Sequence, residues 1–430
     1  MTERFSMSDR EGRWVLATTI MGSSIVLLTA TSVNVALPSI GRELEATAAG
    51  IQWVVTGYFI TMASLMLTGG ALGDRLGRRR VYLVGVAIFA GASVACAAAP
   101  TLGLLVGARF VQGVGGALLT PGSLAIINAA IRPEDRGRAV GLWAGLTGIA
   151  TAVGPLLGGW LVDAWSWRAI FLLNVPVAVA VFVVAIARLP ADLRGDGRRV
   201  DVPGAVLATV ALATFTFAVV QGPERGWGDG WIVAAILAAV VAATSFVVVE
   251  KRGGDPMLPL AVFSRRTFTA ANLVTVSVYG PLSAMFFLLN LYLQNALGYS
   301  PLESGAAGLP VTALMLVLSP AAGDLAQRIG PRTLLTAGPL VMAASLVWFA
   351  GLQPGDAYLV AVAGPVTVFG LGLAATVSPV TSTALAALPS EDSGLASGVN
   401  NTVARASQLV AIAAIPPIAG LTGTAFEDVG

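Results

Sequence analysis

The sequence predicts an all-α membrane protein whose chain crosses the bilayer about thirteen times. Of its 430 residues, 56% are hydrophobic and only 11% are charged, and the mean hydropathy is +0.81. A soluble domain carries about 25% charged residues, so this chain could not cover a water-facing surface with its own charges. Uncharged runs that are long enough to span a bilayer also recur along the whole sequence.

Each predicted span offers the roughly 20 apolar residues that a helix needs to cross the hydrocarbon core. The third span follows Arg80 and ends at a turn over residues 99–101. The ninth lies within residues 267–302 and ends in a turn over residues 298–301. The others lie within residues 14–41, 46–73, 102–131, 139–162, 169–187, 202–220, 231–249, 304–323, 333–355, 357–390 and 393–421.

The distribution of Lys and Arg predicts the orientation of these spans. With the N-terminus in the cytoplasm, twenty basic residues fall in cytoplasmic segments, and only Arg42, Arg168 and Arg225 fall outside. The remaining two, Arg109 and Arg405, lie within spans. This excess follows the positive-inside rule, so we expect a multi-pass protein with a cytoplasmic N-terminus.

The composition argues against an enzyme and against a nucleic-acid-binding protein. The net charge is only +2, and the acidic residues do not cluster at membrane depth. The chain has no histidine and a single cysteine, Cys96, inside an apolar run. It therefore lacks the usual general base and the usual metal ligands, and we expect no cofactor and no metal site.

Two loops on the predicted cytoplasmic side resemble each other. Residues 70–79 read GALGDRLGRR, and residues 323–332 read GDLAQRIGPR. Both have Gly, Leu, Arg, Gly and Arg at the same relative positions, which favours an internal repeat over two unrelated basic turns. Repeated halves are common in transporters, where the substrate site lies between the halves near the midplane.

Five segments carry a resemblance to a known family. They are the loop over residues 70–79, residues 105–115 (LVGARFVQGVG), residues 154–159 (GPLLGG), residues 167–176 (WRAIFLLNVP) and residues 33–38 (VNVALP). In this order the sequence resembles the major facilitator superfamily, specifically its fourteen-span drug:proton antiporter branch (EmrB/QacA type). The resemblance covers essentially the whole chain.

The resemblance implies the major facilitator fold, with two six-helix pseudo-repeats and two extra central helices. The N-terminal six-helix half would cover residues 1–190, and the linker with the two additional helices residues 191–266. The C-terminal half would cover residues 267–430 and lack the expected last helix. The resemblance also implies a monomer in the bacterial inner membrane, in contact with the lipid bilayer, a small-molecule substrate and protons.

Two motifs are expected to control conformation. The resemblance implies that the loop over residues 70–79 latches the halves together in the outward-facing state; a basic anchor is the alternative. The latch residues are Gly70, Asp74, Arg75, Gly77, Arg78 and Arg79. The antiporter motif of the fifth helix is matched by Gly154, Pro155, Gly158 and Gly159, which permit a kink and close packing.

Two charges within the spans are candidate pathway residues. A charge at the bilayer centre costs about 2.5–3.5 kcal/mol on insertion scales. Arg109, with Gln112 one turn on, either clamps backbone carbonyls or faces a cavity and organises proton or substrate traffic, and we favour the cavity. Arg405, close to Asn401 and Gln408, forms either a satisfied polar seam or part of the path.

One position departs from the family pattern. The branch has an aspartate in its first helix, where this chain has Thr29, five residues before Asn34. All 23 acidic residues fall in loops, tails or span ends, and the nearest candidate proton carrier is Asp163. We therefore hypothesise that proton coupling is altered, weak or absent, or that Asp163 substitutes for the missing acid.

The sequence thus predicts a transporter that exports small amphipathic molecules, such as drugs or antibiotics, by alternating access. A neutral, zwitterionic or anionic cargo fits better than a cation, because no carboxylate lies at the midplane. The alternatives are a facilitator or importer of a small metabolite on the same fold, and an inactive truncated transporter.

Overall fold

The computed structural model describes residues 5–190, 201–254, 256–351, 358–388 and 393–418. Within these ranges the chain is helical, apart from one β-bridge between Phe5 and Ile131. The predicted linker segment 191–200 and the tail 419–430 lie outside the described residues.

The first six helices are α1 (Arg10–Glu43), α2 (Ala48–Leu76), α3 (Arg78–Ala98), α4 (Leu102–Ala130), α5 (Pro133–Ala164) and α6 (Arg168–Arg188). They are followed by α7 (Val202–Arg225), α8 (Gly230–Arg252) and a short 3-10 helix (Leu260–Ser264). The remainder comprises α9 (Arg266–Asn295), α10 (Pro301–Ala306), α11 (Leu309–Ile329), α12 (Pro331–Phe349), a π-helical turn (Leu359–Ala363), α13 (Gly364–Ala386) and α14 (Ser393–Ile418).

Glycines with a left-handed backbone separate two pairs of helices. Gly77 lies between α2 and α3 with φ of 102°, and Gly330 lies between α11 and α12 with φ of 85°. Only glycine adopts such angles without a steric penalty. The two residues occupy equivalent positions in the two similar loops, so the internal repeat extends from the sequence to the backbone geometry.

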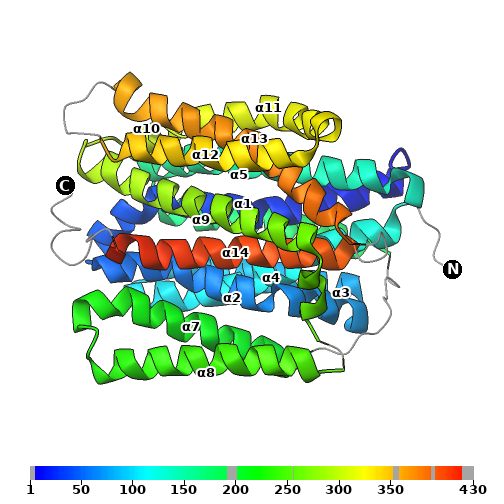
Figure 1. Cartoon of the computed structure of the whole chain (residues 1–430), viewed down its shortest axis with the longest axis horizontal. Coiled ribbons are helices and arrows are strands. Elements are labelled where there is room, and N and C mark those ends of the chain that lie inside the picture. The colour runs from blue at the N-terminus through cyan, green and yellow to red at the C-terminus, as the bar shows by residue number, and fades with distance from the viewer. Residues whose placement is uncertain (1–4, 191–200, 255, 352–357, 389–392, 419–430) are drawn as a thin grey trace.

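Successive long helices run in alternating directions, so the bundle has two ends (Figure 1). The end at which α1 begins carries the α2–α3 and α11–α12 connections, with Arg75, Arg80 and Arg328, and is called the basic end. The opposite end, called the far end, holds the last residue of α1, Glu43, and the first residue of α6, Arg168.

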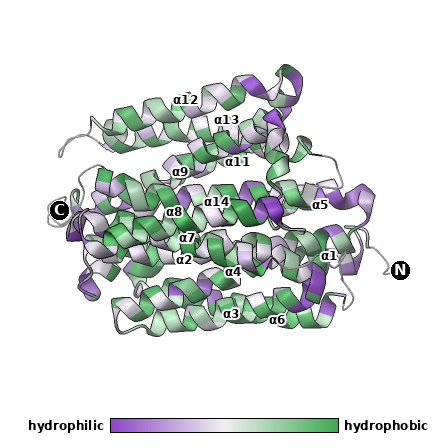
Figure 2. Ribbon diagram, turned by 60° about the horizontal axis from the view of Figure 1, so that its bottom comes forward, coloured by the Kyte–Doolittle hydropathy of each residue, from purple (hydrophilic) through white to green (hydrophobic). Residues whose placement is uncertain are grey.

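Twelve segments of the described chain are long and apolar enough to cross a membrane, with α10 and α11 together forming one of them. Figure 2 shows that hydrophobic residues cover much of the helix lengths, whereas hydrophilic residues gather toward the two ends. The thirteenth helix, α14, is 26 residues long but carries Asn400, Asn401, Arg405 and Gln408, and it packs mainly against α9 and α2. The predicted all-α membrane fold is confirmed.

Hydrophobic packing organises the helices into two groups and a hairpin. One large cluster of buried side chains is built mainly from α1 to α6, which are called the first group. A second cluster is built mainly from α9, α11, α12 and α13. These helices, together with α10 and α14 of the same part of the chain, are called the second group. Helices α7 and α8 pack on each other along one side of the bundle, with α7 against α2 and α14 (Figure 1).

Two glycines of α4 allow its close approach to α2 and α3. A Cβ atom added at Gly113 would lie 2.2 Å from Thr61 Oγ1 and 2.3 Å from the Tyr58 carbonyl oxygen. One added at Gly115 would lie 2.7 Å from the backbone nitrogen of Phe89. Small residues permit such packing in lipid, where dispersion contacts replace the hydrophobic drive between helices.

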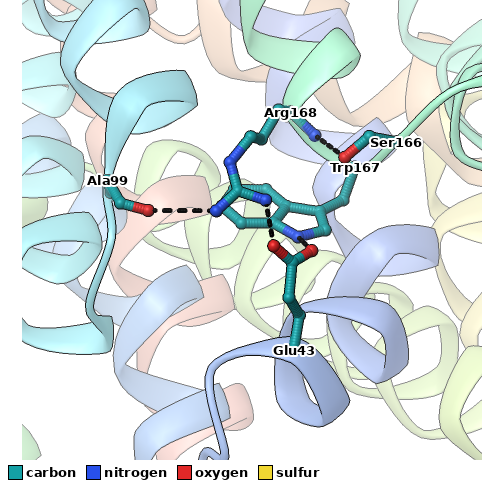
Figure 3. A network of polar contacts seen from close by, with 5 residues as sticks. All are labelled: Glu43, Ala99, Ser166, Trp167 and Arg168. Atoms are coloured by element: carbon teal, nitrogen blue, oxygen red, sulfur yellow. Dashed lines mark hydrogen bonds and ion pairs between the residues drawn. The ribbon is translucent and has the colours of Figure 1, made fainter.

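An ion pair joins three helices at the far end (Figure 3). The Arg168 guanidinium at the start of α6 pairs with the Glu43 carboxylate at the end of α1, and it also donates to the Ala99 carbonyl at 3.3 Å. The Trp167 indole donates to the other Glu43 oxygen at 2.6 Å. The Arg168–Glu43 pair thus connects the ends of α1, α3 and α6, with Arg168 making the contact to α3.

We expect Gly113→Ala to lower the thermal unfolding midpoint of the detergent-purified protein. The added methyl group meets backbone and side-chain atoms, and overpacking of this kind costs about 1–3 kcal/mol. The control is Gly107→Ala on the same helix, where an added Cβ meets nothing within 4 Å. The control should unfold at the wild-type temperature or slightly above it; equal midpoints for the two variants would contradict the packing argument.

Candidate functional site

A cavity of about 1550 Å³ lies between the two groups of helices. Its walls come from α1, α2, α4 and α5 on one side and from α9, α11, α13 and α14 on the other. The cavity extends to the basic end, where Asp74, Arg78 and Arg136 line it. A volume of this size exceeds what a drug-sized ligand requires.

Contacts between the two groups close the cavity at the far end. The Gln294 side chain of α9 donates to the Val35 carbonyl of α1 at 2.8 Å. The Asp163 carboxylate at the end of α5 accepts a hydrogen bond from the Leu302 backbone nitrogen of α10, also at 2.8 Å. Asp163 is exposed there and distant from the middle of the bundle, so in this conformation it bridges the two groups rather than lining a path.

The glycines of the α5 motif allow close packing of α5 on two sides. A Cβ at Gly154 would lie 2.1 Å from Thr31 Oγ1, and one at Gly158 would lie 2.9 Å from Ser32, both on α1. A Cβ at Gly159 would lie 2.3 Å from the Pro301 carbonyl oxygen of α10. Gly154 and Gly158 therefore allow α5 to pack closely on α1. Gly159 allows the close contact with α10 that belongs to the far-end closure.

The kink residue of the same motif, Pro155, has no N–H to donate to the Thr151 carbonyl one turn earlier. Thr31 of α1 donates to that carbonyl instead, at 2.9 Å. Ser32 donates to the Gly154 carbonyl at 2.8 Å. In lipid such freed backbone groups need a partner from a neighbouring helix, and α1 supplies it.

Arg109 and Gln112 form a clamp inside the first group of helices. The Arg109 side chain is fully buried, and it donates to the Val54 carbonyl of α2 at 2.9 Å and to Gln112 Oε1 at 2.6 Å. Its Cζ atom lies 4.2 Å from the centroid of the Tyr58 ring. Gln112 in turn donates to Ser93 of α3 at 2.8 Å. Neither Arg109 nor Gln112 lines the cavity in this conformation, contrary to our expectation for Arg109.

The first helix places its two candidate residues differently. Thr29 is fully buried, with its hydroxyl within hydrogen-bonding distance of the Ile25 carbonyl at 2.6 Å and of Asn174 Oδ1 on α6 at 3.0 Å. Asn34 lines the cavity, and its Oδ1 atom has no hydrogen-bond partner. The position of the missing acid therefore faces α6, whereas Asn34 faces the space between the two groups.

Helix α14 presents two polar faces with different surroundings. Asn400 donates to Thr275 at 2.7 Å and to Asn272 at 3.2 Å, both on α9, and so forms a satisfied seam. Asn401 and Arg405 belong to the other face, which lines the cavity together with Ser397 and Gln408. Helix α14 thus has a satisfied polar seam on one face and a cavity-lining face, which includes Arg405, on the other.

The residues of the predicted latch make their contacts within the first group. Asp74 pairs with Arg78 at 2.8 Å, Arg78 also donates to the Ala125 carbonyl of α4 at 3.3 Å, and Arg79 donates to the Ile186 carbonyl of α6 at 2.5 Å. Arg75 is exposed. Gly70 lines the cavity, as do Asp74 and Arg78.

The sequence prediction missed a backbone segment at the basic end that reaches the cavity. Met257 and Pro259 line it. The Met257 nitrogen donates to Asp201 at 3.3 Å and the Leu258 nitrogen donates to Glu250 at 3.0 Å, so acids from α8 and the start of α7 hold the segment in place. Glu250 is only 3% exposed, and because burial is not visible in the sequence, no pattern there indicated this contact.

The wall chemistry is mostly apolar with a few convergent polar groups. Aromatic side chains come from Phe59, Trp143, Tyr279 and Phe286. A bundle of membrane-spanning helices around such a cavity, closed at one end, defines a membrane carrier for a small molecule.

The sequence profile of the Major Facilitator Superfamily matches residues 19–412, and the chain belongs to this family. Its resemblance to the superfamily, read from the motifs, is thereby confirmed.

Several curated relatives are resistance proteins. The chain is 35% identical to the multidrug resistance protein Stp of Mycobacterium tuberculosis, over 89% of this chain and 71% of that protein. It is 34% identical to the tetracenomycin C resistance and export protein of Streptomyces glaucescens, over 95% of this chain and 76% of that protein. It is 37% identical to the methylenomycin A resistance protein of Streptomyces coelicolor, over 92% of this chain and 83% of that protein.

Solved structures share the fold at low sequence identity. The crystal structure of the peptide transporter POT in complex with sulfate superposes with a TM-score of 0.69 and 17% identity, covering 99% of this chain and 92% of that one.

We expect Arg109→Lys to lower the unfolding midpoint by an amount equivalent to about 1.5–3 kcal/mol, because a buried charge loses its paired hydrogen bonds. A lysine cannot reproduce the planar fork that reaches Val54 and Gln112 together. Arg405→Lys, at the cavity surface, is the control and should unfold at nearly the wild-type temperature. Equal losses in both variants would show that Arg109 is not a special structural clamp.

Proposed function

We propose that this chain exports small amphipathic molecules, of the drug or antibiotic class, from a bacterial cell by alternating access. The observation that carries the proposal is the large cavity between two groups of helices that meet at the far end. The names of the relatives support the cargo class, because three of them are resistance proteins and one is named an export protein.

We further propose that the basic end faces the cytoplasm. The bias of Lys and Arg toward this end supports that orientation, since positively charged loops are retained inside. The N-terminus would then be cytoplasmic, and the conformation described would be open toward the cytoplasm, ready to take up a cargo for export.

The moving bodies in this proposal are residues 1–190 and 267–430, with residues 191–266 as the linker and additional helices. The internal repeat and the separate hydrophobic clusters support this division. We take a monomer as the working unit, because both sets of helices that line the cavity belong to one chain.

Each group of predicted site residues receives a role in this cycle. Asn34, Asn401 and Arg405 face the cargo from opposite walls. Arg109 and Gln112 hold α2, α3 and α4 together as one moving body, and Thr29 contributes to the α1–α6 contact. Asp163 and Gly159 belong to the far-end closure, which must open for release. The residues of the loop over 70–79 act when the basic end closes.

The test uses the purified chain in liposomes under an inside-acid pH gradient. Uptake of a fluorescent cationic dye, of a neutral antibiotic and of the amphipathic anion 1-pyrenebutanoate is followed together with the lumenal pH. Uptake against the cargo gradient with loss of protons from the lumen indicates a proton-linked exporter. Movement only down the cargo gradient indicates the facilitator alternative, and no movement of any amphipathic cargo contradicts the proposed function.

We expect Gly159→Ala to slow transport by shifting the far end toward the open state. The methyl group meets the Pro301 carbonyl, and overpacking of about 1–3 kcal/mol shifts a two-state equilibrium by roughly fivefold to a hundredfold. Gly145→Ala on the same helix, where an added Cβ meets open space, should transport normally.

An accessibility measurement separates this effect from simple inactivation. Thr312, which lines the cavity and donates to the Ala152 carbonyl, is replaced by cysteine; the native Cys96 is buried. A membrane-impermeant maleimide applied to the far end should label Thr312→Cys faster when Gly159→Ala is also present. Unchanged labelling would show that Gly159 does not control the closure.

A further inference from the structure

The fold accounts for one of the two arginines within the spans and leaves the other unexplained. Arg109 has a carbonyl, an amide oxygen and an aromatic ring as partners, and it holds helices together. Arg405 lies midway along α14 and lines the cavity. An arginine at this depth is unfavourable unless its charge is used, so the position of Arg405 calls for a partner.

Arg405 has spare hydrogen-bonding capacity. Its only hydrogen bond within the described chain is from one terminal nitrogen to Gln408 Oε1, at 2.7 Å. Its Nε atom is shielded from solvent and has no partner. A guanidinium offers five N–H groups in a planar fork, and most of those on Arg405 remain available.

The surroundings supply no counter-charge. Within the described residues, no carboxylate lies at salt-bridge distance from Arg405. Among the described residues, Asp74 is the one acid that lines the cavity, and it already pairs with Arg78 at the basic end.

The same cavity has an apolar wall. Tyr279 and Phe286 lie two turns apart on α9, and both face the cavity. Leu282 and Met315 add aliphatic surface. A ligand with an aromatic body and one acidic group would therefore cover the apolar wall while its acid pairs with the guanidinium, and such charged hydrogen bonds are the strong ones.

We propose that the cavity takes amphipathic organic anions and that Arg405 binds their acidic group. The inference rests on the proposed export function for its physiological meaning, although the binding site can be tested without transport. Asn401, one turn from Arg405 on the same face, and Asn34, which lines the cavity from α1, would hydrogen-bond polar substituents of the same cargo.

Two probes that differ only in charge test the site. The full chain in lipid nanodiscs is titrated with 1-pyrenebutanoate and with 1-pyrenebutanol, and empty discs give the background partition into lipid. In the wild type the anion should bind about tenfold more tightly than the alcohol, as expected for one charge-assisted hydrogen-bonded contact. Arg405→Gln should bring the two affinities within about twofold of each other without changing that of the alcohol.

Two further variants serve as controls. Arg405→Lys keeps the charge and should retain an anion preference of about threefold or more. Arg78→Gln removes a cation that lines the same cavity but is already paired, so the preference should stay within about twofold of the wild-type value. Size-exclusion profiles and unfolding midpoints verify that each variant is folded. If Arg405→Gln does not fold, the anion preferences of the wild type and of Arg405→Lys test the proposal instead.

Equal wild-type affinities for the two probes, or an equal loss of both in Arg405→Gln, would overturn the proposal. The outcome is separable from that of the export function. A wild type that binds the anion through Arg405 but moves no cargo in liposomes contradicts export and leaves the site standing. A wild type that transports uncharged cargo without an anion preference leaves export standing and removes the site.

Discussion

Close backbone contact at glycine is the constraint on which this structure depends. In lipid, neighbouring helices gain no hydrophobic drive from one another, so their association relies on packing and on interhelical hydrogen bonds. Gly113 and Gly115 bring α4 against α2 and α3, and Gly154 and Gly158 bring α5 against α1. These contacts make the first six helices a unit with little room for internal adjustment. Gly159 uses the same geometry for a different purpose, because its neighbour belongs to the other group of helices.

The polar groups follow from this packing. Once α2, α3 and α4 lie close together, the guanidinium of Arg109 can reach a carbonyl of α2 while Gln112 reaches a hydroxyl of α3. Similarly, the approach of α1 to α5 places Thr31 beside the carbonyl that Pro155 leaves without a donor. Buried polar groups that satisfy one another in this way stiffen the body that carries them. Within the described residues Arg405 has only Gln408, on its own helix, as a hydrogen-bond partner, and our proposal that Arg405 binds cargo starts from this difference.

Most of the architecture could be predicted from the sequence, because lipid permits few solutions. The apolar spans and the internal repeat follow from apolar length and from two similar loops, although only twelve of the thirteen predicted spans are apolar enough in the described chain. Gly77 and Gly330 have the left-handed backbone that their equivalence suggests. The facing of individual polar residues could not be predicted. Arg109 and Arg405 are both arginines within spans followed by glutamine three residues on, yet one lies inside a helix cluster and the other lines the cavity. That difference is decided by which neighbour each helix meets, and helical periodicity alone carries no such information.

The same limit applies to Thr29. The family pattern marks its position as important, but only the packing of α1 on α6 shows that it meets Asn174 rather than the cavity. The backbone of Met257 and Leu258 is held by two acids, Asp201 and Glu250, from other segments of the chain. No local sequence pattern predicts these contacts.

The polarity of α14 has a consequence for how the chain is made. Helices enter the bilayer during synthesis according to their individual apolarity, and a central arginine opposes that entry. The polar seam between Asn400 and α9 offers a compensating environment only after α9 is in place. Insertion of α14 therefore depends on an assembled protein surface instead of on lipid alone. Changes in this seam would then bear on the insertion of α14 as well as on its packing against α9 in the finished bundle.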